Sequence, residues 1–397
     1  MLAGGPQGPP FFITLLNIFA PRLLPPVGSA HPLPKGTFLM PNDPFNAGLN
    51  RRTLLAALAA FAAASGTLPP AAAETQVAVT GNPLPSWNDG PAKKAILDFI
   101  RATTDPASKD FVPPEERIAT FDQDGTLWVE HPIYSQLVYC LDRVPALVKA
   151  KPHLAKVEPF KTVLTGDFEK IGKLPLRAFE EIAVATLTGM DVETFQAEVK
   201  AWIGEAKDHR WKRLYTELTY QPMQEVLTLF RANGYKTFIV TGGGQDFVRV
   251  YSERVYGIPR ENVVGSALGT KFGYDKHGKP FLTKEPKLLL NDDHAGKPEG
   301  IHLEIGRRPR AAFGNSIGDR QMLEYTKAGD GARLSMLVLH DDGNREYAYG
   351  PAQGLPESKV GTFPQALYDE AKKDGWFVLS MKDDWKRIFA FEESAKR

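Results

Sequence analysis

The sequence has little cysteine, little net charge and few long hydrophobic runs. Its only cysteine among 397 residues is Cys140, which excludes an internal disulfide and a metal centre built from several cysteines. The 48 Lys and Arg residues almost balance the 47 Asp and Glu residues, and the formal net charge of +1 argues against nonspecific binding to nucleic acid. Hydrophobic residues make up 43% of the chain, which is typical of a globular protein and excludes a disordered chain or a polytopic membrane protein.

Residues 1–73 are predicted to be a leader that ends in an export signal. The apolar run at residues 11–20 is shorter than the about 20 residues that a membrane-spanning helix needs. Arg51-Arg52 precedes an apolar stretch at 54–64 and the small residues 71–73, an order typical of a twin-arginine signal with its cleavage site. Met40 is an alternative start, in which case residues 1–39 are not translated. We expect a periplasmic or extracellular protein without stable membrane insertion after signal removal; a buried Ala-rich helix is the alternative.

Four short apolar runs further along the chain each stop at a polar cluster. They lie at residues 118–121, 237–240, 311–313 and 334–339. Continuous apolar runs bounded by glycine and separated by helical stretches are typical of buried parallel strands in an α/β sheet. Ligands bind beyond the carboxyl ends of such strands, so the polar clusters are expected to meet at one edge of the sheet.

The first cluster contains two closely spaced carboxylates, Asp122 and Asp124. Two carboxylates at one strand end repel each other unless a cation neutralises them, and a hard divalent ion such as Mg²⁺ prefers oxygen ligands. One aspartate can attack phosphorus, while the other protonates the leaving group and later activates water. The alternative is a surface Asp-Gly turn.

Two further clusters contain groups that suit a phosphate or a metal ion. Thr241 is followed by Gly242 and two more glycines, so a hydroxyl and freely oriented backbone N–H groups could hold phosphate oxygens, with a helix over 245–256 behind them. A flexible turn is the alternative. Asp319 adds a carboxylate, and Asn315 offers a carbonyl oxygen or a hydrogen bond to Asp319, although either could instead cap a helix.

With these motifs in order, the chain resembles hydrolases of the haloacid dehalogenase superfamily. Asp122-Gln123-Asp124-Gly125-Thr126 matches the first motif, Asp-x-Asp-x-Thr, and Thr241 matches the second. Lys297, which precedes a helix expected over residues 299–306, is taken as the third-motif lysine, and residues 314–319 as the fourth motif. The resemblance implies a Rossmann-like core, Mg²⁺, Asp122 as nucleophile and Asp124 as general acid and base. It also implies that Thr241 and Lys297 hold phosphoryl oxygens, and that Asp122, the Asp124 backbone carbonyl, Asn315 and Asp319 bind the metal.

The sequence departs from the family pattern at one position and leaves another open. Asn315 stands where the family usually has a metal-binding aspartate, so one negative charge is missing from the site. Lys284 and Lys287 are rivals to Lys297 for the third-motif lysine, and any of the three could be a solvated surface residue.

The spacing between the first two motifs predicts an inserted cap. The 134–213 segment is mostly helical in pattern and is expected to form a helical cap on a core of residues 74–133 and 214–397. A β-hairpin is expected over residues 268–283, around Asp275-Lys276-His277-Gly278. This layout is similar to that of the phosphoserine-phosphatase-like branch, in which the cap would exclude water and select the substrate.

The sequence points to a phosphatase without identifying its substrate. Trp128, Glu130 and His131 follow the first motif and are candidates for contacts with the leaving group, while Trp128 could equally pack in the core. His340, Asp341, Asp342 and Arg345 follow the last apolar run and could shape the same mouth or form an ordinary polar loop. We expect an Mg²⁺-dependent phosphomonoesterase for a small organic phosphate. The alternatives are a phosphomutase, a dehalogenase and a catalytically silent ligand-binding protein.

Overall fold

A computed structural model describes residues 81–392, which form a seven-stranded sheet flanked by helices. The strand order is β4-β3-β2-β1-β5-β6-β7, and every neighbouring pair is parallel except β3 and β4. The strands are β1 (Ile118–Phe121), β2 (Lys236–Gly244), β3 (Val263–Tyr274), β4 (Pro280–Leu290), β5 (Ala311–Gly314), β6 (Leu334–Leu339) and β7 (Phe377–Ser380). The predicted α/β class with a Rossmann-like parallel sheet is therefore confirmed.

The central strands are buried on both faces, as their continuous apolar runs indicate. Every residue of β1, β5 and β6 is buried. Their side chains alternate between two apolar clusters, so that Phe313 joins one cluster while its neighbour Ala312 joins the other. Helices α3 (Pro91–Thr104) and α9 (Gln221–Ala232) contribute to the first cluster. Helices α13 (Arg320–Lys327) and α14 (Gln365–Lys373) contribute to the second.

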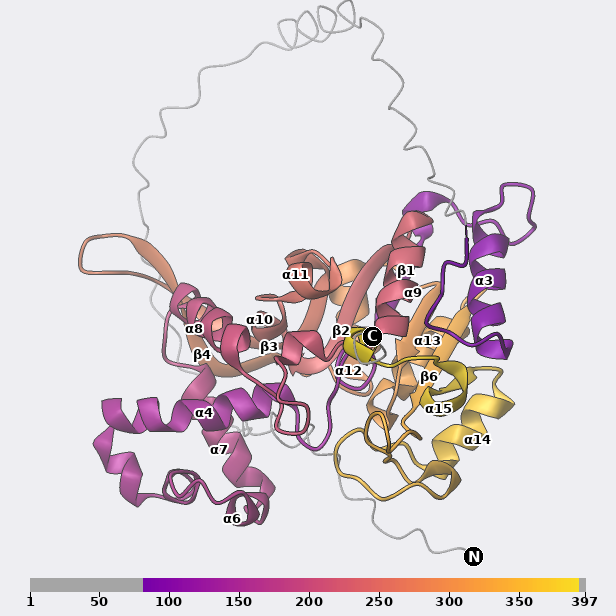
Figure 1. Ribbon diagram of the computed structural model, residues 1–397. Coiled ribbons are helices and arrows are strands. Elements are labelled where there is room, and N and C mark those ends of the chain that lie inside the picture. The colour runs from indigo at the N-terminus through magenta and orange to yellow at the C-terminus, as the bar shows by residue number, and fades with distance from the viewer. Residues whose placement is uncertain (1–80, 393–397) are drawn as a thin grey trace, which may run out of the picture. The chain divides into compact units, whose positions relative to one another are not determined.

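The segment between β1 and β2 contains helices that were expected to form a cap. They are α4 (Ser135–Ala150), α5 (Phe160–Val163), α6 (Phe168–Gly172), α7 (Leu176–Leu187) and α8 (Val192–Glu205). Helices α4 and α7 pack against each other, with α6 nearby (Figure 1). A short loop separates α7 from α8. In it, Gly189 adopts a left-handed φ of 81°, and the Asp191 carboxylate accepts a hydrogen bond from the Thr194 backbone N–H at 2.7 Å.

The predicted hairpin is present and longer than expected, since β3 and β4 pair over most of their length. In its turn, the Asp275 carboxylate accepts hydrogen bonds from the backbone N–H groups of His277 and Lys279. The hairpin is joined to the loop between α7 and α8 by two backbone hydrogen bonds of 2.9 Å. They run from Gly189 N–H to the Lys284 carbonyl and from Lys284 N–H to the Met190 carbonyl. The helical segment is thus attached to the sheet at a third point, besides its two ends.

Two predicted helices differ in detail from the structure. The helix expected over 245–256 is split into α10 (Gln245–Val248) and α11 (Ser252–Tyr256). Between them, the N–H groups of Val250 and Tyr251 donate to carbonyls three residues earlier, a tighter 3₁₀ pattern that interrupts the α-helix. The helix expected over 299–306 begins earlier, as α12 (Gly296–Gly300), and continues as a wider π-helical turn over Ile301–Ile305.

The predicted export signal lies outside the described residues. Within residues 81–392, no helix combines the length and apolar character needed to cross a bilayer.

A further short helix, α15 (Met381–Asp384), follows β7.

Candidate active site

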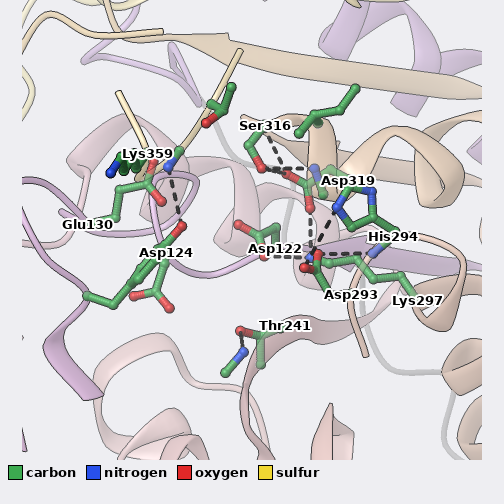
Figure 2. Close-up of a pocket in the computed structure, with 17 residues that line it drawn as sticks. Asp122, Asp124, Glu130, Thr241, Asp293, His294, Lys297, Ser316, Asp319 and Lys359 are labelled. Carbon is green, nitrogen blue, oxygen red and sulfur yellow. Dashed lines mark hydrogen bonds and ion pairs between the residues drawn. The ribbon is translucent and has the colours of Figure 1, made fainter. Parts of the chain in front are cut away.

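The carboxyl ends of β1, β2 and β5 open into a cavity that contains most of the predicted site residues. Asp122, Asp124 and Glu130 line it from the β1 side, Thr241 and Gly242 from β2, and Lys297 and Asp319 from elements after β4 and β5 (Figure 2). Trp128 and Asn315 do not line this cavity and are buried beside it. This convergence is the one expected of polar groups that follow parallel strands.

Asp122 is held through both of its carboxylate oxygens. Its backbone N–H donates to the Phe313 carbonyl at 2.9 Å, which continues the pairing of β1 with β5. Lys297 Nζ donates to Asp122 Oδ1 at 2.6 Å, and Thr126 Oγ1 donates to Oδ2 at 3.3 Å. Burial, and then the nearby Asp319 carboxylate, raise the Asp122 pKa well above its ordinary value, while Lys297 opposes that shift. The geometry gives this carboxylate a fixed orientation toward the cavity.

Asp124 sits in an environment suited to proton transfer. Burial raises the pKa of Asp124 to about 6, against smaller opposing effects from the Trp128 hydrogen bond and from Lys297. A group with such a pKa can both give and take a proton near neutral pH. The Trp128 indole Nε1–H donates to Asp124 Oδ1 at 2.7 Å, and the indole stacks on Tyr251. Trp128 therefore lies behind Asp124 and orients it.

Lys297 occupies the centre of the site. Its ammonium donates to Asp122 Oδ1 at 2.6 Å, and at 2.7 Å to both Asp319 Oδ1 and the Val240 carbonyl. Burial alone would lower the Lys297 pKa, but Asp122 and Asp319 outweigh it and raise that pKa. The rival Lys284 is buried elsewhere, paired with Asp246 and stacked over the Phe195 ring, and Lys287 is exposed on β4.

The carboxyl-terminal end of β2 has the form expected of an anion cradle. The Gly243 backbone N–H donates to Thr241 Oγ1 at 3.0 Å, which fixes the hydroxyl at the edge of the cavity. Gly244 N–H donates to Gln136 Oε1 on α4 at 2.7 Å, so this helix also holds the end of β2. A Cβ atom at Gly243 would crowd Thr241, and one at Gly244 would crowd Gln136, which explains these two glycines.

Asp319 and Asn315 organise the loop after β5. Asp319 Oδ2 accepts the backbone N–H groups of Asn315 and Ser316 at 2.9 and 3.0 Å, while Oδ1 accepts from Lys297. Both Asp319 oxygens are thus engaged within the protein. The Asn315 side chain donates through Nδ2 to Glu130 Oε1 at 2.6 Å, and its Oδ1 lies 3.3 Å from Thr126 Oγ1, whose single proton is shared between this oxygen and Asp122 Oδ2.

The polar residues after β6 do not line the cavity. His340 is buried, with Nε2 2.8 Å from the Gly125 carbonyl and Nδ1 3.0 Å from Glu346 Oε2. Since a carbonyl can only accept, Nε2 carries the proton and donates to it. Arg345 pairs with Asp342 and also donates to the Met381 and Trp385 carbonyls. His340 therefore supports the turn at Gly125, whereas Arg345 ties the loop after β6 to residues near α15.

Several cavity residues were missed by sequence reasoning. Asp293 and His294 lie just after β4, near Lys297, while Lys359, Gly361 and Thr362 come from the loop between β6 and α14 (Figure 2). The acidic stretch after an apolar strand could have indicated Asp293. Nothing in the 340–364 segment marks Lys359 or Gly361, because their role depends on how a long irregular loop folds back.

The donor atoms around Asp122 fit a hard divalent cation. Carboxylates outnumber lysines along the cavity, and the groups near Asp122 present oxygen atoms, the donors that Mg²⁺ prefers. Among residues 81–392, no group of three or more His, Cys, Asp or Glu side chains is arranged to hold a metal ion. A cation at Asp122 would therefore also need neutral oxygen ligands. The Asp124 backbone carbonyl and the Asn315 side-chain amide are groups that could provide them.

One protein family matches a large part of the chain. The profile of the haloacid dehalogenase-like hydrolase family matches residues 119–324, about half of the chain. A search of curated protein sequences found no match. Similar solved structures include proteins of unknown function from Anaerococcus prevotii and from Bordetella pertussis. The first has 16% identity and a TM-score of 0.43, covering 63% of this chain and 86% of that one. The second has 14% identity and a TM-score of 0.41, covering 66% and 98%.

A third similar structure is a phosphoserine phosphohydrolase-like protein from Francisella tularensis. It has 17% identity and a TM-score of 0.31, covering 56% of this chain and 88% of that one. The family match spans the first motif, the cap segment and the loop after β5. The chain belongs to the haloacid dehalogenase-like hydrolase family.

Proposed function

We propose that this hydrolase is an Mg²⁺-dependent phosphomonoesterase that acts on a small organic phosphate. The observation that carries the proposal is the arrangement of Asp122 and Asp124 at one strand end, with Lys297 bonded to Asp122. A dehalogenase needs no acid for its leaving group, whereas Asp124, with its pKa of about 6, is suited to protonate an alkoxide.

The first half of the reaction transfers the phosphoryl group to the protein. An Asp122 carboxylate oxygen attacks phosphorus, a new P–O bond forms, and the bond between phosphorus and the leaving oxygen breaks. Asp124 gives its proton to that leaving oxygen, so an alcohol departs. Thr241 and the backbone of Gly242 bind the phosphoryl oxygens, and Lys297 lies beside Asp122 to balance their charge.

The second half regenerates Asp122. Asp124, now ionised, takes a proton from water, and the hydroxide attacks phosphorus as the bond to the Asp122 oxygen breaks. Inorganic phosphate and free Asp122 are the products. A bound Mg²⁺ would be held by Asp122, the Asp124 backbone carbonyl and Asn315, with Asp319 beside them, and would supply positive charge against the phosphoryl oxygens.

The substrate is expected to be small, and the protein is expected to act after export. The helices at 134–213 would exclude water and select the leaving group, as in the phosphoserine-phosphatase-like branch. Phosphoserine itself is not favoured, because those phosphatases carry a glutamate nine positions after the nucleophile, where this chain has His131. The signal at Arg51-Arg52 supports a periplasmic or extracellular location.

Phosphate release from a panel of phosphomonoesters tests the proposal. The panel contains phosphoserine, phosphocholine, phosphoethanolamine and p-nitrophenyl phosphate, each assayed with Mg²⁺ and with EDTA. We expect release with Mg²⁺ and little with EDTA, with the ranking of substrates reporting the preference of the cap. A folded protein that binds metal but releases no phosphate from any phosphomonoester would contradict the proposed function.

A further inference from the structure

Glu130 is a buried carboxylate that none of the four family motifs includes. It is 3% exposed, and its only open side faces the cavity. A Cβ atom added at either Gly125 or Gly361 would collide with its carboxylate, and both glycines have a left-handed φ, of 79° and 60°. Two backbone turns from distant parts of the chain therefore close around this one side chain.

The Glu130 carboxylate is bonded to the side chain that departs from the family pattern. Asn315 Nδ2 donates to Glu130 Oε1 at 2.6 Å, a short hydrogen bond to an acidic group. This bond fixes the orientation of the Asn315 amide, so that its Oδ1 faces away from Glu130. Thr126 Oγ1 lies 3.3 Å from both Asn315 Oδ1 and Asp122 Oδ2. The Thr126 hydroxyl thus links the Asn315 amide oxygen to the Asp122 carboxylate.

Glu130 is in turn held by an aromatic stack. The Tyr349 hydroxyl donates to Glu130 Oε1 at 2.8 Å. The Tyr349 ring packs between the rings of His131 and His340, each with a centroid distance of 4.4 Å. Since His340 also donates to the Gly125 carbonyl, the stack fixes both the carboxylate and the turn that follows Asp124.

We propose that Glu130 positions the Asn315 amide oxygen for a divalent cation at Asp122. Glu130 is then a positioning residue that acts through Asn315. The inference rests on the metal requirement of the proposed function.

The sequence suggested a different role for Glu130, as a contact for the leaving group. The two roles predict different measurements. A substrate contact would change the KM and the ranking of substrates without changing metal affinity. A positioning residue would change the affinity for the metal in the absence of any substrate.

Reciprocal exchange of the two side chains separates these roles. The variants are E130Q, N315D and the double variant E130Q/N315D in the full chain, with E225Q as a matched control. Glu225 is also buried and also accepts hydrogen bonds, from Ser86, but lies on α9 outside the cavity. Mn²⁺ serves as the probe because it shares the oxygen ligands of Mg²⁺ and gives an electron paramagnetic resonance signal when free. Melting temperatures in EDTA show which variants fold.

The expected pattern is loss and rescue of metal affinity. E130Q should bind Mn²⁺ about 10–100-fold more weakly than the wild type, the usual range for loss of a supporting carboxylate. N315D alone places two carboxylates in contact and should lower the melting temperature in EDTA. In the double variant, the amide at position 130 can donate to the carboxylate at position 315, so affinity should return to within a few-fold of wild type. E225Q should bind Mn²⁺ like the wild type.

Two results would overturn the inference. One is wild-type Mn²⁺ affinity in a folded E130Q protein, particularly together with an altered ranking of substrates. The other is a folded double variant that binds Mn²⁺ no better than E130Q. Phosphate release is measured on the same samples. A wild type that binds Mn²⁺ but hydrolyses nothing contradicts the proposed phosphatase, whereas a wild type that hydrolyses phosphomonoesters in EDTA without binding Mn²⁺ contradicts the metal requirement and this inference.

Discussion

Asp122 is the residue on which the proposed chemistry depends most directly. Asp122→Asn should lower phosphate release by roughly 10⁴-fold or more, because an amide cannot replace the attacking carboxylate. The fold should survive, since burial already disfavours the ionised carboxylate and Asp319 still pairs with Lys297. Phosphate release and the melting temperature are the measurements, with Asp98→Asn, a partly exposed aspartate on α3, as control. Near-wild-type turnover in Asp122→Asn would refute the nucleophile assignment.

The loss of rate on replacing Asp124 should increase with the basicity of the leaving group, because a more basic leaving group depends more on protonation. Asp124→Asn should slow alkyl phosphates such as phosphoethanolamine more than p-nitrophenyl phosphate, whose phenolate departs with little help from an acid. The measurement is the ratio of kcat/KM for the two substrates in variant and wild type. Equal losses on both substrates would argue that Asp124 has no role as a general acid.

His131 is expected to make the protein sensitive to mild acid. Burial, and then His340, lower the pKa of His131 to about 4, from 6.5 for an ordinary histidine. The unfolded chain therefore binds a proton more readily than the folded one, and stability is lost as the pH falls from about 6.5 toward 4. His131→Gln should reduce the drop in melting temperature between pH 7 and pH 5. A drop of the same size in both proteins would assign the acid sensitivity to other groups.

Motif spacing could locate the side chains that directly follow strands, but not those brought in by loops. Asp122, Asp124 and Thr241 were predictable because parallel strands deliver their carboxyl ends to one edge. The position of Trp128 was open, since only the folded structure shows its indole bonded to Asp124. Gly361 could not be predicted, because it reaches Glu130 from a loop without a periodic pattern.

At the scale of helices and strands, the loop between α7 and α8 ends in an N-cap, Asp191, that begins α8. Asp191→Ala removes the acceptor for both the N–H and the hydroxyl of Thr194, each at 2.7 Å, and should destabilise α8 by about 1 kcal/mol. Urea unfolding measures the loss. The control is Glu193→Ala, an exposed residue of the same turn, which should have a much smaller effect. Equal losses of stability in both variants would show that the Asp191 N-cap makes no specific contribution to the stability of α8.

Buried strands were predictable from their apolar runs, whereas strand β7 and the split between α10 and α11 were not. The runs that became β1, β5 and β6 are apolar throughout because both faces of those strands are covered. β7 lies at the sheet edge with partly exposed positions, so its apolar pattern is weak. The split between α10 and α11 depends on local 3₁₀ bonding that helical periodicity does not encode.

At the scale of the whole molecule, the expected export signal makes a prediction about the mature chain. Secreted protein from a bacterial host with a twin-arginine pathway should begin at Glu74, after cleavage behind Ala73. R51K/R52K should keep the protein uncleaved inside the cell, with R22K as the control substitution. Mass spectrometry of the intact protein in each fraction gives the answer. Export of the paired variant at the wild-type level would argue against this pathway.

The contact between Gly361 and Glu130 also bears on when the site can form during synthesis. Glu130 follows β1, the first strand of the described chain, whereas Tyr349 and Gly361 belong to its last part. A ribosome delivers residues from the N-terminus onward, so the turn after Asp124 must wait for more than two hundred further residues, about half of the chain, before its partners exist. A nascent or prematurely terminated chain would carry every family motif and still lack the completed site. Activity would then arise only at the end of translation.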